Sequence, residues 1–211
     1  MCAHLLSERP VWIQSAQINK IASDLHDEVG SSLTRISIYS ELVQSGTEAT
    51  QSKSYLKSIS EMSREIVSTM SDIVWSIDNR NDSTGALILR MKDFATEVFQ
   101  AKNIEMSFVV EGVDESRTLD PALKQNIYLI FKESVNNIVK HANAQHVSIS
   151  LINRGNEFSM KIHDDGTGFP NDGNQKGNGL RNMHRRAQAI NAIFSITTNS
   201  GTTIAVSRRS L

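Results

Sequence analysis

Two long segments with a helical repeat of apolar residues dominate the first 80 residues. Between about residues 52 and 77, apolar side chains recur at steps of three and four, as on one face of an α-helix. They are Tyr55, Ile59, Met62, Ile66, Met70, Ile73 and Ile77. Between about residues 11 and 44 the same spacing joins Ile18, Ala22, Leu25, Val29, Leu33 or Ser32, Ile36 and Val43. The pattern predicts two long helices.

The two expected helices are joined by a short polar loop that begins at Ser45-Gly-Thr. Long helices with so short a connection pack antiparallel. A lone two-helix hairpin cannot shield both apolar seams from water. Two copies packed side by side do so by forming a four-helix bundle, which predicts a homodimer.

Composition limits the class of protein. The 211 residues carry a net charge of −1, so no overall field favours nucleic acid or acidic lipid. The single cysteine, Cys2, excludes a disulfide framework and a cysteine-based zinc site, and fits a reducing cytosol. The sequence shows neither a signal peptide nor an apolar run of spanning length. We expect a cytoplasmic chain, and its start suggests a piece of a longer protein.

The pattern changes after the polar stretch Asn79-Arg-Asn-Asp-Ser-Thr-Gly85, which we interpret as a linker. Asp120-Pro121 supplies a helix N-cap and a proline for the first turn. Arg154-Gly155-Asn156 supplies a hairpin turn. We expect helices at 86–101, 120–141 and 180–189, and strands at 105–110, 146–153, 157–163, 193–198 and 202–208. This order predicts a two-layer α/β sandwich with a mostly antiparallel sheet.

Polar residues share one face of the helix expected at 120–141. Glu133, Asn137 and either Lys140 or His141 recur at steps of three to four residues. Magnesium prefers oxygen ligands such as the Asn137 amide, and Glu133 could orient its waters. Lys140 and His141 could meet phosphate oxygens. The face suits a metal–phosphate group, although an ordinary solvated helix face explains it equally well.

Carboxylates and glycines follow the strand expected at 157–163, in Asp164-Asp-Gly-Thr-Gly168. Gly166 and Gly168 would let the backbone approach a flat ligand closely. Asp164 could accept a hydrogen bond from the amino group of adenine, and would repel the carbonyl of guanine. A plain Asp-Gly turn is the alternative.

A second glycine-rich stretch, Gly173-Asn-Gln-Lys-Gly-Asn-Gly-Leu180, enters the helix expected at 180–189. Backbone N–H groups at a helix N-terminus, with Gly177 and Gly179 beside them, would form an anion cradle. A loop with a glycine helix start is the alternative. Ser200-Gly-Thr-Thr203 would be an ordinary hairpin turn if it stood alone.

Together, the order and spacing of these segments resemble the ATP-binding (Bergerat) fold of sensor histidine kinases, gyrase-type topoisomerases and related chaperones. Glu133, Asn137 and His141 are similar to the family's N box. Asp164–Gly168 is similar to its first glycine box and Gly177–Leu180 to its second. Gly201-Thr-Thr203 is similar to the threonine motif that follows.

Leu25-His-Asp-Glu-Val-Gly30 then resembles the phosphoacceptor box of histidine kinases paired with NarL- and LytR-like response regulators. Ser71-Asp-Ile-Val-Trp-Ser-Ile77 is also similar to that subfamily. By itself, His26 lies beside the seam residue Leu25 and could be a solvated surface histidine. The resemblance makes it the phosphoryl acceptor, with Asp27 as the residue that orients its ring.

The resemblance implies three segments. Residues 1–14 are a remnant of a signalling helix, 15–80 a dimerisation and phosphotransfer domain, and 81–211 a catalytic ATP-binding domain. It implies ATP and Mg²⁺ as cofactors, with Glu133 catalytic, Asn137 and Glu133 at the metal, and the following residues at the nucleotide: Asn137, Lys140, His141, Asp164, Gly166, Gly168, Gly177, Gly179, Leu180 and Thr202.

The implied activity is autophosphorylation of His26 and transfer to an aspartate of a response regulator. The implied partners are a second copy and that receiver domain. The implied link to a membrane would run through a sensor segment upstream. Many relatives carry Gln or Asn four residues after the acid that follows the histidine, where this chain has Ser31, so we expect weak phosphatase activity. A non-kinase ATPase of the same fold, a serine kinase of the anti-sigma type and a degenerate dimerisation scaffold are the alternatives.

Overall fold

The structure is a computed structural model that describes residues 29–46, 48–168 and 178–209. The chain divides into two compact units, Met1–Ile77 and Asp78–Leu211. The expected start of the first helix, with His26 and Asp27, lies outside the described residues. So does Gly177 in the second glycine stretch.

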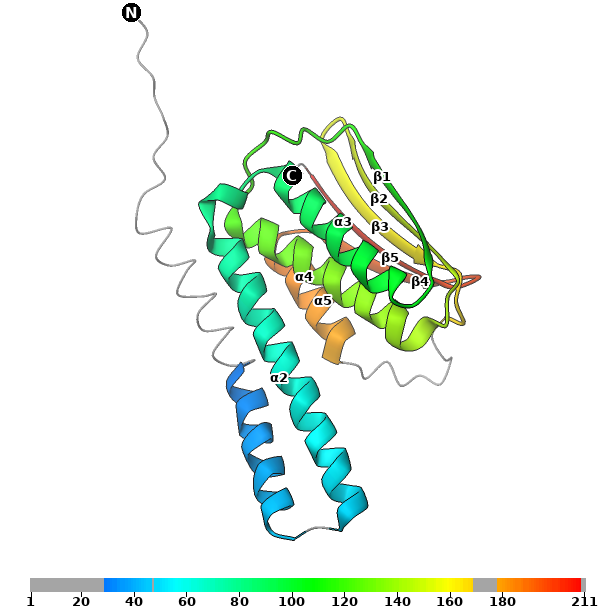
Figure 1. Ribbon diagram of the computed structural model, residues 1–211. Helices are drawn as coiled ribbons and strands as arrows, with labels where there is room; N and C mark the ends of the chain where they lie inside the picture. Colours follow the sequence, from blue (N-terminus) through cyan, green and yellow to red (C-terminus); the bar gives the residue numbers. More distant parts are fainter. Residues whose placement is uncertain (1–28, 47, 169–177, 210–211) are drawn as a thin grey trace, which may run out of the picture. The chain divides into compact units, whose positions relative to one another are not determined.

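The first unit contains the expected pair of helices. Residues 29–44 are helical, and α2 spans Ala49–Ile77 after a short turn at 45–46 (Figure 1). The rings of Tyr39 and Tyr55 stack with centroids 5.1 Å apart, one from each helix. The sequence left Leu33 and Ser32 as alternatives for the first seam. Leu33 is 52% exposed and Ser32 is half-buried, so Ser32 lies nearer the seam.

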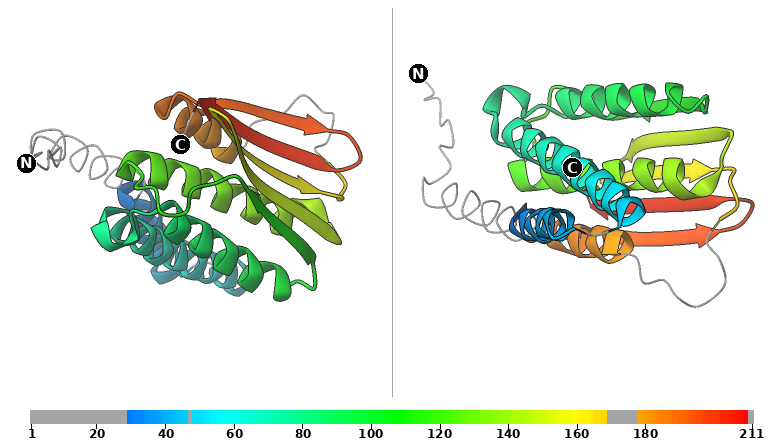
Figure 2. Two further views of the ribbon diagram at one scale, coloured as in Figure 1. Left: turned by 90° about the horizontal axis from the view of Figure 1, so that it is seen from above. Right: turned by 60° about the horizontal axis from the view of Figure 1, so that its bottom comes forward.

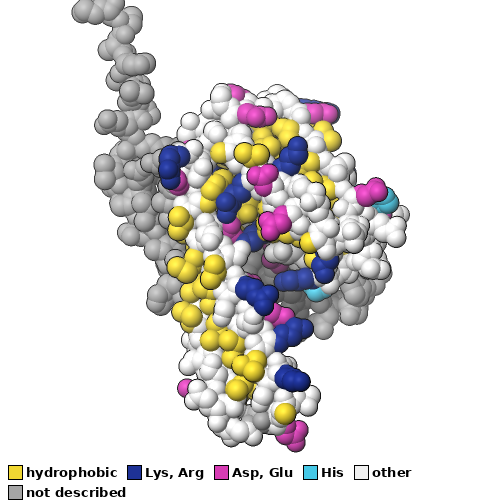
Figure 3. Space-filling view, in the orientation of Figure 1, with side chains coloured by type: hydrophobic (Ala, Val, Ile, Leu, Met, Phe, Trp, Pro, Cys, Tyr) yellow, Lys and Arg dark blue, Asp and Glu magenta, His cyan; other side chains and the backbone are white. Residues whose placement is uncertain are grey.

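The apolar residues of α2 form two stripes rather than one. Met62 and Ile73 are buried, whereas Met70, which we expected beside them in the seam, is half exposed. Exposed apolar side chains continue along α2 at Leu56, Val67, Met70 and Val74. Figure 3 shows hydrophobic side chains gathered along this helix. A single hairpin therefore leaves a long apolar surface in contact with water.

The second unit is a sheet covered on one face by helices. Its elements are η1 (Asn79–Asn81), α3 (Thr84–Gln100), β1 (Glu105–Glu111), α4 (Pro121–Asn137), η2 (Ile138–Ala142), β2 (His146–Arg154), β3 (Glu157–Asp164), α5 (Asn178–Ala189), β4 (Ile193–Thr198) and β5 (Thr202–Arg209). The strand order is β1-β2-β3-β5-β4, with β1 parallel to β2 and the other neighbours antiparallel. Helices α3, α4 and α5 lie side by side over one face (Figure 2).

The core of this unit lies between the helices and the sheet. Alternate residues of β2 and β3 are buried, as expected for strands with one covered face. They meet apolar residues of all three helices. The fully buried side chains include Met91 and Phe99 of α3, Ile127, Phe131 and Val135 of α4, and Met183 of α5. The expected two-layer sandwich is confirmed.

The helix expected to continue to His141 changes its form before it ends. After Asn137 the backbone widens into a π-helical turn, Ile138–Ala142, which ends at Asn143 in the left-handed conformation with φ 51°. Such wide turns are rare and are frequent at functional sites. This turn forms one wall of the pocket described below.

The second half of the expected linker belongs to the second unit. The backbone N–H groups of Thr84 and Gly85 donate to carbonyls of residues 117 and 115, each at 2.9 Å. Asp82 accepts at its carbonyl from Leu119 N–H at 2.7 Å, and its carboxylate lies 2.6 Å from the Lys124 ammonium. The linker interpretation is therefore wrong for residues 82–85. Their polar side chains and backbone are hydrogen-bonded to other residues of the second unit, and Thr84 is buried.

Asp120 caps α4 in the way its sequence indicates. Its carboxylate accepts hydrogen bonds from the N–H groups of Ala122 at 2.9 Å and Leu123 at 3.4 Å. We expect Asp120→Ala to lower the free energy of unfolding by about 1 kcal/mol, because two helix N–H groups lose their acceptor. Urea unfolding measures this loss. Asp120→Asn keeps a cap acceptor and should stay close to the parent; equal losses in both variants would contradict the capping role.

Candidate functional site

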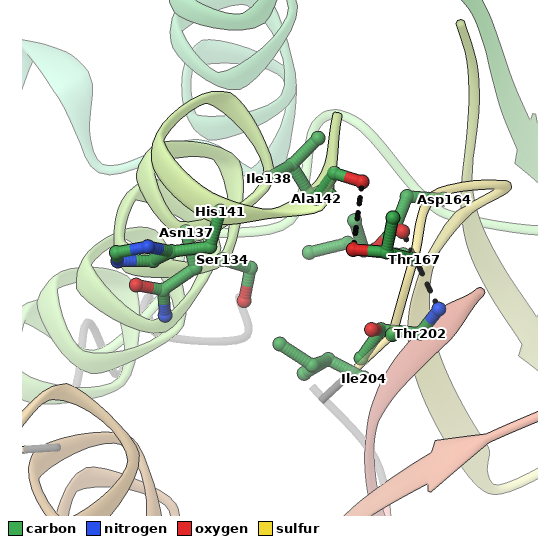
Figure 4. A pocket seen from close by; sticks show the side chains of 11 residues that line it. Ser134, Asn137, Ile138, His141, Ala142, Asp164, Thr167, Thr202 and Ile204 are labelled. Atoms are coloured by element: carbon green, nitrogen blue, oxygen red, sulfur yellow. Dashed lines mark hydrogen bonds between the residues drawn. The ribbon is translucent and has the colours of Figure 1, made fainter. Parts of the chain in front are cut away.

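A pocket of about 370 Å³ lies between the end of α4 and the ends of the inner strands β3 and β5 (Figure 4). One wall is α4 with its π turn, and the other is the end of β3, the loop after it and the start of β5. Its polar lining is Ser134, Asn137, His141, Asp164, Thr167 and Thr202, and its apolar lining is Ile138, Ala142, Ile162 and Ile204, with Gly168 at the loop.

Asp164 is the buried acid of the pocket, with 3% of its surface exposed. Its Oδ1 accepts from the backbone N–H groups of Gly166 at 3.0 Å and Thr202 at 3.4 Å. A buried carboxylate needs such partners because its desolvation is costly. Both bonds end on Oδ1, so Oδ2 can accept a hydrogen bond from a ligand. The site is therefore suited to a ligand with an amino group.

Glycines allow the backbone to close around Asp164. A Cβ on Gly166 would collide with the carbonyl of Ala142, and a Cβ on Gly201, at φ +110°, would collide with the carbonyl of Asp164. Thr167 fixes the loop further, because its N–H donates to Ala142 O at 2.8 Å and its hydroxyl to the same oxygen at 3.3 Å. The loop is thus held tightly on the end of the π turn.

The polar face of α4 is divided by the structure. Asn137 and His141 line the pocket, whereas Lys140 is exposed and is not part of its lining. Glu133 faces the start of α5, since a Cβ on Gly179 would collide with the Glu133 carboxylate. The sequence offered either Lys140 or His141 for this face, and it is His141 that lies at the pocket.

The start of α5 is described from Asn178 onward. Gly179 and Leu180 are half-buried in its first turn. Their N–H groups belong to the N-terminus of a helix, where an anion is favoured. Thr202, from the threonine motif, lies at the pocket and donates its N–H to Asp164.

Several lining residues were not among the candidates from sequence. Thr167 stands inside the first glycine stretch, so its position in that motif could have indicated it. Ile162 and Ile204 pair directly across β3 and β5. Their apolar character shows in the sequence, but the strand pairing that brings both to the pocket does not. Ser134 also lines the pocket, with its hydroxyl donating to Ile130 O at 2.8 Å.

Two family models match segments of the chain. Residues 19–81 match a family described as histidine kinase, and residues 122–209 match one described as histidine kinase-, DNA gyrase B- and HSP90-like ATPase. The two matches together cover well over half of the chain.

The curated proteins that the chain resembles include several sensor histidine kinases. The chain is 28% identical over 189 residues to the sensor histidine kinase YvfT of Bacillus subtilis, covering 89% of this chain and 48% of that protein. It is 29% identical over 191 residues to DesK of the same organism, covering 87% and 48%. It is 25% identical over 207 residues to the histidine-protein kinase/phosphatase UhpB of Salmonella typhimurium, covering 97% and 41%. The chain spans about half the length of the curated relatives it matches.

Solved structures share the fold. Acinetobacter baumannii histidine kinase AdeS superposes with a TM-score of 0.57 at 13% identity, covering 87% of this chain and 97% of that one. The histidine kinase domain of the Erythrobacter litoralis blue-light activated kinase gives 0.54 at 17% identity, covering 89% and 93%.

The chain thus belongs to the histidine kinase family. The ATPase match over residues 122–209 implies that its second unit binds ATP. Within the described residues, no helix is both long and apolar enough to cross a membrane.

Proposed function

We propose that this chain is a kinase core that phosphorylates itself on His26 with ATP and passes the phosphoryl group to an aspartate of a response regulator. The observation that carries the proposal is the buried Asp164 carboxylate on the wall of the pocket. It occurs in a chain whose first segment matches the histidine kinase family. The activity would belong to the two expected domains, residues 15–80 and 81–211, in which most of the two matched segments, 19–81 and 122–209, lies.

Asp164 would read the adenine ring. With Oδ1 held by two backbone N–H groups, Oδ2 is the acceptor that meets the exocyclic amino group. Guanine has a carbonyl at that position and would face a like-charged oxygen. Gly166 and Gly168 let the loop lie against the flat base, and Ile162 and Ile204 offer it an apolar surface.

The other predicted residues would hold the phosphates and the metal. Asn137 presents an amide oxygen at the pocket, which suits Mg²⁺, and Glu133 lies beside the first turn of α5, where it could orient a metal-bound water. Mg²⁺ would neutralise charge on the phosphates. The residues proposed to meet the phosphates are Lys140, His141, Gly177 and Gly179. Leu180 and Thr202 are proposed as further nucleotide-binding residues.

His26 would be the nucleophile. An imidazole has an unperturbed pKa near 6.5, so a neutral ring is abundant at pH 7. One ring nitrogen attacks the γ-phosphorus while the other donates to Asp27, which fixes the tautomer and stabilises the charged product. The β–γ bond breaks and ADP leaves. We retain Ser31 as the reason to expect weak phosphatase activity, because its hydroxyl is shorter than the amide of Gln or Asn.

The proposed assembly is a homodimer through the first unit. The exposed stripe of α2, with Val67 64% and Val74 69% exposed, is the surface that a second copy would cover. Four helices around one core satisfy both stripes. The receiver domain of the regulator would dock on this bundle, in the cytoplasm, where ATP is available.

Incubation with γ-labelled ATP and Mg²⁺ tests the proposal. We expect label that is stable to base and labile to acid, at up to one phosphate per chain. His26→Gln should abolish the label and leave ADP binding unchanged. Steady phosphate release without label would instead indicate an ATPase. Label that survives His26→Gln would refute the phosphoacceptor, and absence of nucleotide binding would indicate a dimerisation scaffold.

A further inference from the structure

The segment Asp164–Gly168, here called the glycine loop, contains a second acid, Asp165. Its carboxylate is hydrogen-bonded to the start of β2 and does not line the pocket. Its Oδ1 accepts from the backbone N–H groups of Gln145 at 2.8 Å and His146 at 2.9 Å. Its Oδ2 lies 2.8 Å from Nδ1 of the His146 ring. Its own N–H donates back to His146 O at 3.2 Å. The two residues are therefore joined by a closed set of hydrogen bonds.

A third group completes this cluster from the neighbouring strand. Glu105, the first residue of β1, places Oε2 3.3 Å from Nε2 of His146. The imidazole thus lies between two carboxylates, one from β1 and one from the loop after β3. The part of the chain that the structure describes has no group of three or more His, Cys, Asp and Glu side chains able to hold a metal ion.

The cluster is connected to the pocket through a short piece of backbone. Residues 142–146 run from the π turn to β2. At one end of this piece, Ala142 accepts from Thr167 and lies against Gly166. At the other end, His146 is bound by Asp165. The glycine loop is thus hydrogen-bonded to both Ala142 and His146, the two ends of this backbone segment. Asp164 directly precedes Asp165, which makes the bonds to His146.

We propose that the His146–Asp165 pair positions the glycine loop for the nucleotide, and that the protonated imidazole, held between Asp165 and Glu105, is the form that does so. This inference rests on the proposed nucleotide site and adds two positioning residues to it. Neither residue lines the pocket. Their effect on a ligand must pass through Asp164 and the loop.

The hydrogen bonds between His146 and Asp165 are here called the clamp. The charges around the imidazole ring determine the pH range in which the clamp is strong. The hydrogen bond to Asp165 raises the pKa of His146, and the negative charges of Asp165 and Glu105 add to this. The pKa of Asp165 falls to about 2, chiefly through the backbone hydrogen bond from His146, so this carboxylate is ionised at working pH. The pKa of His146 is higher in the folded state than the ordinary value of about 6.5. The clamp is therefore fully formed below this ordinary value and weakens as the pH rises through the raised pKa.

The neutral ring keeps part of the clamp. It can still donate Nδ1–H to Asp165. Nε2 then carries a lone pair instead of a proton, and this lone pair repels the Glu105 carboxylate. Deprotonation should therefore loosen the loop without releasing it. A residue that served the fold alone would affect unfolding and leave the pH dependence of ligand binding unchanged.

The test is the dissociation constant of Mg-ADP, measured by calorimetry on the full chain from about pH 6 to about pH 9. Each variant is compared with the parent at the same pH, which cancels the titration of the nucleotide. His146→Ala should bind ADP more weakly by a factor on the order of ten at the acid end, and this ratio should shrink as the pH rises. His146→Asn, whose amide can replace Nδ1–H, should recover part of the affinity. Because asparagine does not titrate, the pH dependence of ADP binding in this variant should be that of the nucleotide alone.

Glu105→Gln is the variant that separates positioning from folding. Glu105 is 82% exposed in its side chain and has no contact with the loop in the hydrogen bonds described above. Removing its charge should lower the pKa of His146 and move the midpoint of the parent's pH profile to lower pH. A parent that binds ADP with the same pH profile as His146→Ala or Glu105→Gln would overturn the inference. A parent that does not bind ADP would overturn the proposed function, and this inference with it.

Discussion

Asp164→Asn is expected to weaken binding of adenine nucleotides by about a hundredfold. The backbone N–H groups of Gly166 and Thr202 both point at Oδ1 of the parent carboxylate. In the variant they would select the amide oxygen, which turns the NH₂ group toward the ligand. That donor would meet the amino group of adenine, another donor, in a position that is almost fully buried. The mismatch cannot be relieved by water.

Calorimetry with Mg-ADP measures this loss. The same geometry predicts a second result, because an NH₂ group can donate to the carbonyl of guanine. The ratio of GDP affinity to ADP affinity should rise in the variant, even though the variant binds both nucleotides weakly. Thermal unfolding without nucleotide should change little, since the two backbone bonds remain. Retained ADP affinity in a folded variant would rule out Asp164 as the adenine acceptor.

The helices and strands could be predicted from sequence because their apolar repeats are regular. The strands β2 and β3 alternate buried and exposed residues, and the turn at Arg154-Gly155-Asn156 separates them. The candidates Asn137, His141, Asp164, Gly168 and Thr202 do meet at one pocket. Short motifs report such positions well, because the spacing within one helix or one loop is fixed by local geometry.

Features that depend on packing between distant segments could not be predicted. The π turn at Ile138–Ala142 has no residue type that demands it. Met70 fits the repeat of the seam, yet the rotation of α2 leaves it on the exposed stripe. The pairing of His146 with Asp165 joins residues that are 19 apart in the sequence. From the sequence alone, His146 has no metal-ligand spacing and would be taken as a structural or surface residue.

Lys124 shows the same limit, and it leads to the largest expected change in stability. A lysine in a helix is ordinarily solvated, but Lys124 is fully buried in α4, with its ammonium 2.6 Å from Asp82 and 3.3 Å from Asn81 O. Burying a charge is unfavourable unless it is paired. Asp82→Ala should therefore lower the free energy of unfolding by about 3 to 5 kcal/mol, because it removes the carboxylate that lies 2.6 Å from a fully buried ammonium.

Combining Asp82→Ala with Lys124→Met should recover much of this loss, since methionine keeps the apolar stem and removes the charge. Urea unfolding of the parent, both single variants and the double variant gives the coupling between the two residues.

Asp78→Ala is the matched control. The Asp78 carboxylate also pairs with a cation, Arg80, and the hydrogen bond from that side chain is the main reason that the pKa of Asp78 is lowered to about 2. The Arg80 side chain, however, is 89% exposed. Water can replace that partner, so the control should cost little. A loss in Asp82→Ala no larger than in Asp78→Ala would mean that the Asp82 carboxylate contributes little to holding residues 81–85 on the second unit, and that their backbone hydrogen bonds are sufficient.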